Sequence, residues 1–122
     1  MRVKRIVANV ATADPAAADL FYRQILGLEL AMDRGWIRTF AGACQMTVQI
    51  GFASEGGSGT PVPDLSVEVD DLDEALRRVQ QHGIALEYGP VLEPWGVRRF
   101  FVRDPFGKLV NILQHDPAAA DA

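Results

Sequence analysis

Cysteine is nearly absent from this chain: Cys44 is the only one among 122 residues. A single thiol can form neither an intrachain disulfide nor a cysteine-based metal cluster. We therefore interpret Cys44 as a small core or half-buried side chain rather than as a nucleophile. At this length the chain can bury roughly two-thirds of its unfolded surface, which is enough for a stable domain without cross-links.

Positive charge and long apolar runs are scarce as well. The formal net charge is −4 and the main basic cluster is Arg2-Val3-Lys4-Arg5, which disfavours nucleic-acid binding. No apolar run is long enough to cross a membrane, and the short one after the basic N-terminus does not match a signal peptide. We expect a cytoplasmic protein that binds neither nucleic acid nor a membrane.

The most strongly specified segment is a hairpin over residues 93–115. Asp104-Pro105-Phe106-Gly107 has the residues of a type I turn. If Gly107 forms the bulge of a three-residue loop, Asp104 faces Lys108 and the strand register follows. Every second residue then shares a face. One face is apolar and suits packing: Phe100, Val102, Val110 and Ile112. The other is mixed and is the better candidate for a ligand surface: Arg99, Phe101, Leu109, Asn111 and Leu113.

The whole chain repeats one pattern: a strand, an Asp-capped helix that ends at glycine, and three further strands. The first module spans about residues 2–52, a Gly/Ser/Pro-rich linker covers 53–63, and the second module spans about 64–115, followed by a frayed tail at 116–122. In the first module we expect a strand over 2–10, a helix from Asp14-Pro15 to Gly27, a weak strand over 28–33 with a turn at 33–35, and a hairpin of 36–40 with 45–50. That hairpin places Ile37 opposite Val48 and Arg38 opposite Thr47. In the second we expect a strand over 64–69, a helix from the Asp71 capping box to Gly83, a strand over 84–88, and a loop over 90–96.

This duplication resembles the vicinal oxygen chelate superfamily, which includes glyoxalase I, extradiol dioxygenases, and fosfomycin- and bleomycin-resistance proteins. The resemblance covers nearly the whole chain. It implies an α+β fold in a single domain over residues 1–122, with two βαβββ modules forming curved mixed sheets around a cleft, and it implies a homodimer. The motifs that carry it are Asn9-Val10 before Asp14, Phe21-Tyr22, Leu26-Gly27-Leu28, Val69-Asp70-Asp71 before Ala75, Trp95-Gly96, and Asp104-Pro105-Phe106-Gly107-Lys108.

The resemblance also places the superfamily's metal-ligand positions, which fall on Arg5, Gln49, Asp64 and Asn111. Arginine has no lone pair to offer a metal, amide oxygens are weak ligands, and one carboxylate does not make a tight site. The two histidines, His82 and His115, are interpreted as a helix-end and a strand-end residue. We therefore expect no metal and no other cofactor.

The cleft-facing side chains suit a small molecule, because aromatic rings can stack on a flat ligand and arginines can hold an anion. The candidate ligand-binding residues are Arg5, Trp36, Arg38, Gln49, Asp64, Trp95, Arg99, Phe101 and Asn111. A purely structural alternative is that Arg5–Asp64 and Arg99–Glu68 are ion pairs and that Phe101 is core.

Three functions follow from these residues. The first hypothesis is a metal-independent binding protein of the bleomycin-resistance type that sequesters an aromatic or anionic ligand. The alternative is a glyoxalase- or dioxygenase-like enzyme, a lyase or isomerase, that uses Asp64 or Glu68 as general base, with or without a divalent metal. A third, protein-binding or regulatory role is also open.

Overall fold

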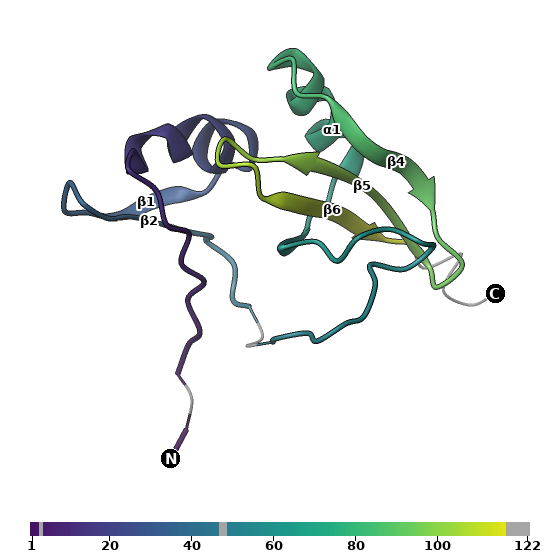
Figure 1. Ribbon diagram of the computed structural model, residues 1–122, viewed down its shortest axis with the longest axis horizontal. Coiled ribbons are helices and arrows are strands. Elements are labelled where there is room, and N and C mark those ends of the chain that lie inside the picture. The colour runs from purple at the N-terminus through teal and green to yellow at the C-terminus, as the bar shows by residue number, and fades with distance from the viewer. Residues whose placement is uncertain (3, 47–48, 117–122) are drawn as a thin grey trace. The chain divides into compact units, whose positions relative to one another are not determined.

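The computed structural model describes residues 1–2, 4–46 and 49–116, and the chain divides into two compact units, Met1–Ser54 and Glu55–Ala122 (Figure 1). The first unit contains the 3-10 helix η1 (Pro15–Ala18), the π-helix η2 (Asp19–Ile25), and strands β1 (Glu29–Asp33) and β2 (Arg38–Ala41). The second contains β3 (Leu65–Glu68), α1 (Leu72–Gln81), β4 (Leu86–Leu92), β5 (Val97–Arg103) and β6 (Leu109–His115). No helix in the described ranges is long and apolar enough to span a bilayer. The expected α+β class with two sheets is confirmed.

The second unit has the βαβββ order that the sequence predicts. Its four-stranded sheet runs β3-β6-β5-β4. Strand β3 pairs with β6 in parallel, while β6–β5 and β5–β4 are antiparallel. The sheet is therefore mixed, as expected.

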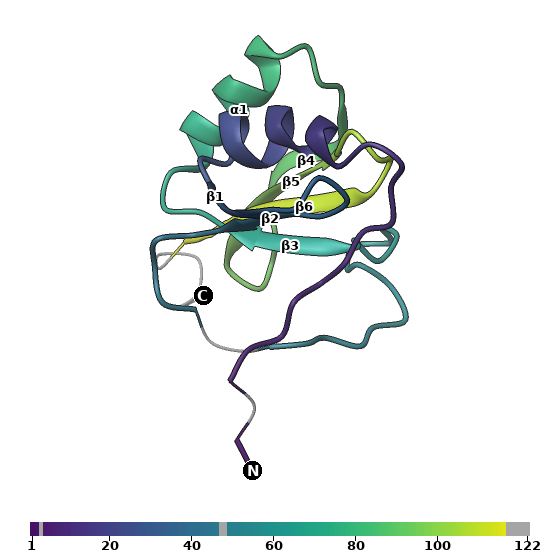
Figure 2. The same cartoon turned by 90° about the vertical axis from the view of Figure 1, so that its left-hand side faces the viewer.

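One face of this sheet forms a core with α1, which Figure 2 shows on one side of the strands. The helix buries Leu72, Ala75 and Val79, whose spacing puts them on one side of a helix. The predicted apolar face of the hairpin is buried throughout: Phe100, Val102, Val110 and Ile112 are all at 0% exposure. The opposite face of the hairpin is left for the candidate site described below.

The predicted register of the β5–β6 hairpin is confirmed. Phe100 pairs with Ile112, Phe101 with Asn111, and Val102 with Val110. The turn is closed by the Asp104 carboxylate, whose Oδ1 accepts from the backbone N–H of Phe106 at 2.8 Å and of Lys108 at 2.9 Å. Gly107 adopts a φ of 77°, which glycine reaches without a Cβ clash. Local turn chemistry thus determines which side chains share a face.

The prediction for β4 is wrong in part. Instead of ending near residue 88 and giving way to a loop, the strand continues through Pro90 to Leu92. Strand β4 lies at the edge of the sheet, where a proline costs no ladder hydrogen bond. Gly89 has a φ of 77°, and a Cβ there would approach the Arg99 carbonyl oxygen to 2.5 Å. The register shifts on both sides of Tyr88, so the Gly89-Pro90 pair is accommodated within the strand as a local irregularity.

The first unit has fewer strands than expected. No described residue among 1–10 is in a strand, so the predicted strand over 2–10 is wrong in the described part. Strand β2 pairs with β1 rather than with residues 45–50, because the turn at Asp33-Arg34-Gly35 connects β1 directly to β2. In this turn Asp33 Oδ1 accepts a hydrogen bond from the Gly35 N–H at 2.9 Å. Alternation alone gives no strand without a neighbour to pair with. The predicted partners of Ile37 and Arg38, Val48 and Thr47, lie outside the described residues, as does the tail beyond Asp116.

The two helical segments differ in how well their caps were predicted. In α1 the Asp71 side chain accepts from the Glu74 N–H at 3.1 Å, which confirms the cap, and Gly83 follows the helix with a φ of 68°. The predicted first helix is instead a 3-10 turn followed by a π-helix, and Asp14 makes no side-chain cap bond. Gly27, with a φ of 72°, ends it as expected.

The α1 cap gives a direct stability prediction. Asp71→Ala leaves an N–H of the first helical turn without its partner and should lower the free energy of unfolding by about 1 kcal/mol, measured by urea denaturation. Asp70→Ala is the matched control: it removes a carboxylate one residue earlier, which accepts no cap bond, and should change stability by less than about 0.5 kcal/mol. Equal losses would contradict the cap's role.

Candidate ligand-binding site

The turn between β4 and β5 brings two opposite charges together. Glu93 and Val97 close the turn, with the Glu93 N–H donating to the Val97 carbonyl at 2.7 Å. Gly96 takes a φ of 88° inside it. Arg99 lies two residues into β5 beyond this pair, and its Nη2 donates to Glu93 Oε2 at 2.9 Å. The two side chains are 4% and 2% exposed, so this is a buried ion pair.

The Arg99 guanidinium is held by backbone as well as by charge. Its Nη1 donates to the Gly56 carbonyl at 2.8 Å and its Nη2 to the Gly57 carbonyl at 3.2 Å. Three aromatic rings surround it: its Cζ lies 4.9, 5.0 and 5.4 Å from the ring centroids of Phe101, Trp95 and Tyr88, respectively. Such rings attract a cation through their negative faces. Arg99 therefore joins β5, the turn and the Gly-rich segment.

Glu93 is satisfied from three sides. Its Oε1 accepts from the Tyr88 hydroxyl at 2.8 Å, and its Oε2 accepts from the Ser58 hydroxyl at 2.7 Å in addition to Arg99. Burial by itself would raise the pKa of this carboxyl, but the hydrogen bonds from Ser58 and Tyr88 and the charge of Arg99 outweigh it and hold the pKa below its ordinary value. Glu93 is thus the ionised partner of Arg99 at neutral pH.

The Gly/Ser/Pro-rich segment, expected to be a flexible linker, is folded onto the sheet at residues 56–60. The Gly56 N–H donates to the Thr60 carbonyl at 2.8 Å, and the Thr60 hydroxyl donates to the Gly57 carbonyl at 2.7 Å. A Cβ at Gly57 would lie 2.7 Å from the Trp95 ring, so glycine allows the close approach. The interpretation as free linker is wrong for these residues because their carbonyls are the acceptors of Arg99.

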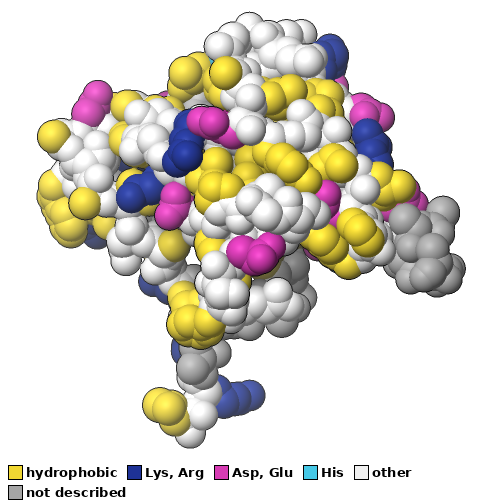
Figure 3. All heavy atoms as spheres, turned by 45° about the vertical axis from the view of Figure 1, so that its right-hand side comes forward, with side chains coloured by type: hydrophobic (Ala, Val, Ile, Leu, Met, Phe, Trp, Pro, Cys, Tyr) yellow, Lys and Arg dark blue, Asp and Glu magenta, His cyan; other side chains and the backbone are white. Residues whose placement is uncertain are grey.

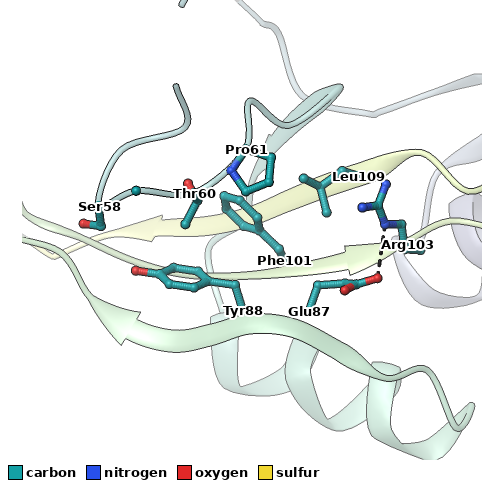
Figure 4. Close-up of a pocket in the computed structure, with 9 residues that line it drawn as sticks. Ser58, Thr60, Pro61, Glu87, Tyr88, Phe101, Arg103 and Leu109 are labelled. Atoms are coloured by element: carbon teal, nitrogen blue, oxygen red, sulfur yellow. Dashed lines mark hydrogen bonds and ion pairs between the residues drawn. The ribbon is translucent and has the colours of Figure 1, made fainter. Parts of the chain in front are cut away.

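Beside this network lies a cavity of about 300 Å³. Figure 4 shows Thr60 and Pro61 next to the Phe101 ring, with Tyr88 below it and Ser58 at the far end from Arg103. The Tyr88 and Phe101 rings are 5.2 Å apart at an interplanar angle of 56°. The full lining is Ser58, Gly59, Thr60, Pro61, Glu87, Tyr88, Phe101, Arg103 and Leu109.

The end of the cavity opposite Ser58 carries a second ion pair. Arg103 Nε donates to Glu87 Oε1 at 3.1 Å, and Arg103 Nη1 donates to the Gly107 carbonyl at 3.0 Å. These side chains are 48% and 46% exposed. The cavity is thus lined by this exposed pair and by Ser58 and Tyr88, two hydrogen-bond partners of the buried Glu93.

The structure brings four of the predicted site residues together. Phe101 lines the cavity, Arg99 and Trp95 stack beside it, and Asn111 lies across from Phe101 on β6. The Asn111 Nδ2 donates to the Ser66 hydroxyl at 3.1 Å. Trp95 is half exposed, while the other three are buried. The mixed face of the β5–β6 hairpin is therefore the wall of the site.

The two candidate general bases do not line this cavity. Asp64 is exposed, and its Oδ2 accepts from the Leu109 N–H at 2.8 Å. Glu68 is exposed and lies 2.6 Å from His115 Nδ1. The predicted Arg99–Glu68 ion pair is therefore wrong, because Arg99 pairs with the nearer Glu93 across its own turn. The predicted Arg5–Asp64 pair stays a prediction.

The remaining candidates belong to the first unit. Arg5, Trp36 and Gln49 are exposed. Arg38 is held by two carboxylates: its Nη1 donates to Asp19 at 2.9 Å and its Nη2 to Asp33 at 3.0 Å. Their contribution to ligand binding stays a prediction.

The candidates taken from the sequence do not include these residues of the cavity or the network: Ser58, Gly59, Thr60, Pro61, Glu87, Tyr88, Glu93 and Arg103. Tyr88 and Glu93 could have been found if β4 had been extended through Pro90, because a longer hairpin puts Tyr88 opposite Phe101. No local signal indicates Ser58, which meets Glu93 across 35 positions of the chain.

The metal-ligand positions implied by the superfamily do not fit a metal here. Asp64 is engaged by a backbone N–H and Asn111 points its amide nitrogen at Ser66, while arginine at the first position cannot donate a lone pair. Within residues 1–2, 4–46 and 49–116, no group of three or more His, Cys, Asp or Glu is placed to hold a metal ion. We derive no chemistry through a metal.

The chain matches a known protein family. The family model for the Glyoxalase/Bleomycin resistance protein/Dioxygenase superfamily matches residues 2–112, and the chain belongs to this family. No curated protein sequence matches the chain.

Solved structures of similar fold include both a binding protein and an enzyme. TnmS3, an antibiotic binding protein from Streptomyces sp. CB03234, is 26% identical with a TM-score of 0.64, over 88% of this chain and 91% of that one. TioX from Micromonospora sp. ML1 is 24% identical with a TM-score of 0.61, over 91% and 95%. Lactoylglutathione lyase from Agrobacterium tumefaciens is 23% identical with a TM-score of 0.60, over 83% and 85%.

The buried pair predicts a contrast between two identical substitutions. Glu93→Gln leaves the Arg99 charge buried and uncompensated and should cost about 3–5 kcal/mol of unfolding free energy. Glu87→Gln removes the same charge from an exposed pair in the same sheet and should cost less than about 1 kcal/mol. Urea denaturation at pH 7 measures the free energy of unfolding of both variants. A similar decrease in the two would contradict the idea that burial makes the Glu93–Arg99 pair more important for stability than the exposed pair.

The depressed pKa of Glu93 predicts a pH dependence with a definite sign. A carboxyl whose pKa is lower in the folded than in the unfolded state stabilises the fold fully above its ordinary value of 4.5, and that stabilisation is lost as pH falls through the lower, folded pKa. The gap in unfolding free energy between wild type and Glu93→Gln should therefore narrow as pH drops below 4.5. A gap that stays constant down to pH 3 would contradict the shift.

Proposed function

We propose that this chain is a metal-independent small-molecule binding protein that sequesters an aromatic ligand in the cavity beside Phe101. The observation that carries the proposal is the cavity itself: about 300 Å³, at the lower end of the usual range for small-molecule sites. Aromatic side chains, a few polar groups and an ordered loop border it, and binding requires no reactive group beyond these.

The walls favour a flat ligand. Phe101 is 1% exposed and packs against Tyr88, which is half-buried, so the Tyr88 ring is held in place and loses little freedom when it stacks on a ligand. The Arg103–Glu87 pair at the exposed end offers polar contacts for a substituent. TnmS3, an antibiotic binding protein that is 26% identical to this chain, supports the same class of function.

The other functional expectations from the sequence stay predictions. The lyase or isomerase alternative with Asp64 or Glu68 as base has no observation in its favour at the cavity, since neither residue lines it. The homodimer and the cytoplasmic location stay predictions.

Figure 3 shows hydrophobic side chains beside charged ones on one face of the surface. The exposed large apolar residues of the second unit are Val62, Leu86, Leu92 and Trp95.

The proposal is tested with a panel of two-ring aromatic probes, namely 2-acetonaphthone, 2-naphthamide and 2-naphthoate, by isothermal titration calorimetry. We expect at least one to bind wild type. Phe101→Leu removes the ring that backs this wall of the cavity and packs on Tyr88, and should weaken that binding by about 0.5–1.5 kcal/mol, or about two- to twelve-fold in Kd.

Phe100→Leu is the matched control, because Phe100 is equally buried but faces α1 on the same strand. It should destabilise the protein to a similar degree and leave the Kd of the folded protein unchanged, as measured at a temperature where both variants are folded by circular dichroism. Absence of binding by the whole panel, or equal loss in both variants, would overturn the proposed function.

A further inference from the structure

Three residues that line the cavity carry a hydroxyl group: Ser58, Thr60 and Tyr88. The hydroxyls of Ser58 and Tyr88 lie 2.7 and 2.8 Å from the two carboxylate oxygens of Glu93. The hydroxyl of Thr60 lies 2.7 Å from the Gly57 carbonyl oxygen. Neither an ionised carboxylate nor a carbonyl has a proton to donate, so each hydroxyl must be the donor. Its proton is therefore already used, and its oxygen keeps only the capacity to accept.

The ionised state of Glu93 fixes the direction of two of these hydrogen bonds. Arginine stays charged in proteins, and Arg99 Nη2 lies 2.9 Å from Glu93 Oε2 in a pair with almost no exposure to water. A neutral Glu93 would leave that buried charge without a partner, which is costly. The hydroxyls of Ser58 and Tyr88 thus have no alternative to donating toward Glu93.

The backbone of the loop over residues 58–61 adds few donors to this side of the cavity. The Gly59 N–H donates to Glu55 Oε1 at 3.2 Å, and the Thr60 N–H donates to the Gly57 carbonyl at 3.0 Å. Pro61 has no N–H at all. The loop side of the cavity therefore offers a ligand acceptors rather than donors.

Ser58 has an unusual backbone conformation for a residue with a side chain. Among the described residues it is the only one other than glycine with a positive φ, 53°, and it lies between Gly57 at 89° and Gly59 at 75°. A Cβ makes this region costly, whereas glycine adopts it freely. Strain of this kind is concentrated at ligand-binding and catalytic sites. What serine adds over glycine at this position is the hydroxyl that bonds to Glu93.

Building on the proposed function, we infer that the ligand is a neutral aromatic molecule with a hydrogen-bond donor, a hydroxyl or amino group, which donates to Ser58 Oγ. Tyr88 Oη offers a second acceptor, and Figure 4 shows both side chains reaching the end of the cavity away from Arg103. Ser58 is exposed and Tyr88 half-buried, whereas Glu93 does not line the cavity. A hydroxyl that donates to a carboxylate is also a stronger acceptor, because hydrogen bonds in a chain polarise one another.

Two further naphthalene probes test this inference by isothermal titration calorimetry at pH 7. 2-Naphthol carries a donor and is neutral at this pH, as phenols are, while 2-methoxynaphthalene keeps the oxygen but has no donor. On wild type, 2-naphthol should bind about two- to twelve-fold more tightly, the range of one net hydrogen bond.

Ser58→Ala removes the proposed acceptor. It should weaken 2-naphthol to the Kd of 2-methoxynaphthalene and leave the Kd of the ether unchanged. A gain in affinity for the ether would instead point to added space. Ser66→Ala is the matched control, because it makes the same substitution on β3 at a residue that does not line the cavity; the preference for 2-naphthol should persist.

Ser58→Gly separates recognition by the hydroxyl from displacement of the loop. Alanine keeps the costly φ and loses the bond to Glu93, whereas glycine adopts the same φ without a Cβ clash. The glycine variant should therefore have a melting temperature at least as high as that of the alanine variant, and it should lose the preference for 2-naphthol to the same degree. A preference that is lost in Ser58→Ala but kept in Ser58→Gly would overturn the inference.

Failure of the proposed function and failure of this inference give different results. If neither new probe nor any member of the first panel binds, the proposed function is overturned and the inference with it. If aromatic probes bind but 2-naphthol is not preferred over its methyl ether, or if Ser58→Ala leaves the preference intact, only the inference is overturned.

Discussion

The second unit depends on one buried ion pair, Arg99–Glu93. Arginine and glutamate this far from water are stable only if every charge has a partner, and the partners here come from three separate segments. Tyr88 comes from β4, Ser58 and two glycine carbonyls come from the loop, and Glu93 itself comes from the turn. Satisfying this single pair therefore holds the loop, the edge strand and the hairpin turn against one face of the sheet.

The two faces of the sheet therefore have different roles. The face under α1 is a conventional apolar core, closed by Phe100, Val102, Val110 and Ile112. The other face would expose Phe101 and Arg99 to water if the loop did not cover it. Because the loop is held by backbone carbonyls rather than by a second apolar layer, room remains beside Phe101 for a small molecule. The cavity is in this sense a consequence of how the buried arginine is satisfied.

The β5–β6 hairpin contains part of the pattern typical of the family and also a residue that differs from the family's usual metal ligands. Its Asp104 turn belongs to the pattern that places the chain in the glyoxalase and bleomycin-resistance superfamily. The same register places the amide of Asn111 at one of the metal-ligand positions that the superfamily resemblance implies. The residues around Asn111 make hydrogen bonds and ring contacts: Asn111 Nδ2 donates to the Ser66 hydroxyl, and Arg99 lies over the Phe101 ring.

The sequence by itself determined the elements whose signals are local. The register of β5 with β6, the Asp71 cap and the βαβββ order of the second unit follow from turn residues, caps and alternation within a few positions. Only the tertiary structure decided that Arg99 pairs with Glu93 and not Glu68, that residues 56–60 pack on the sheet, and that the predicted strand over 2–10 has no partner in the described chain. Those outcomes depend on which distant segments come within hydrogen-bonding distance, and residue type and spacing do not encode that choice.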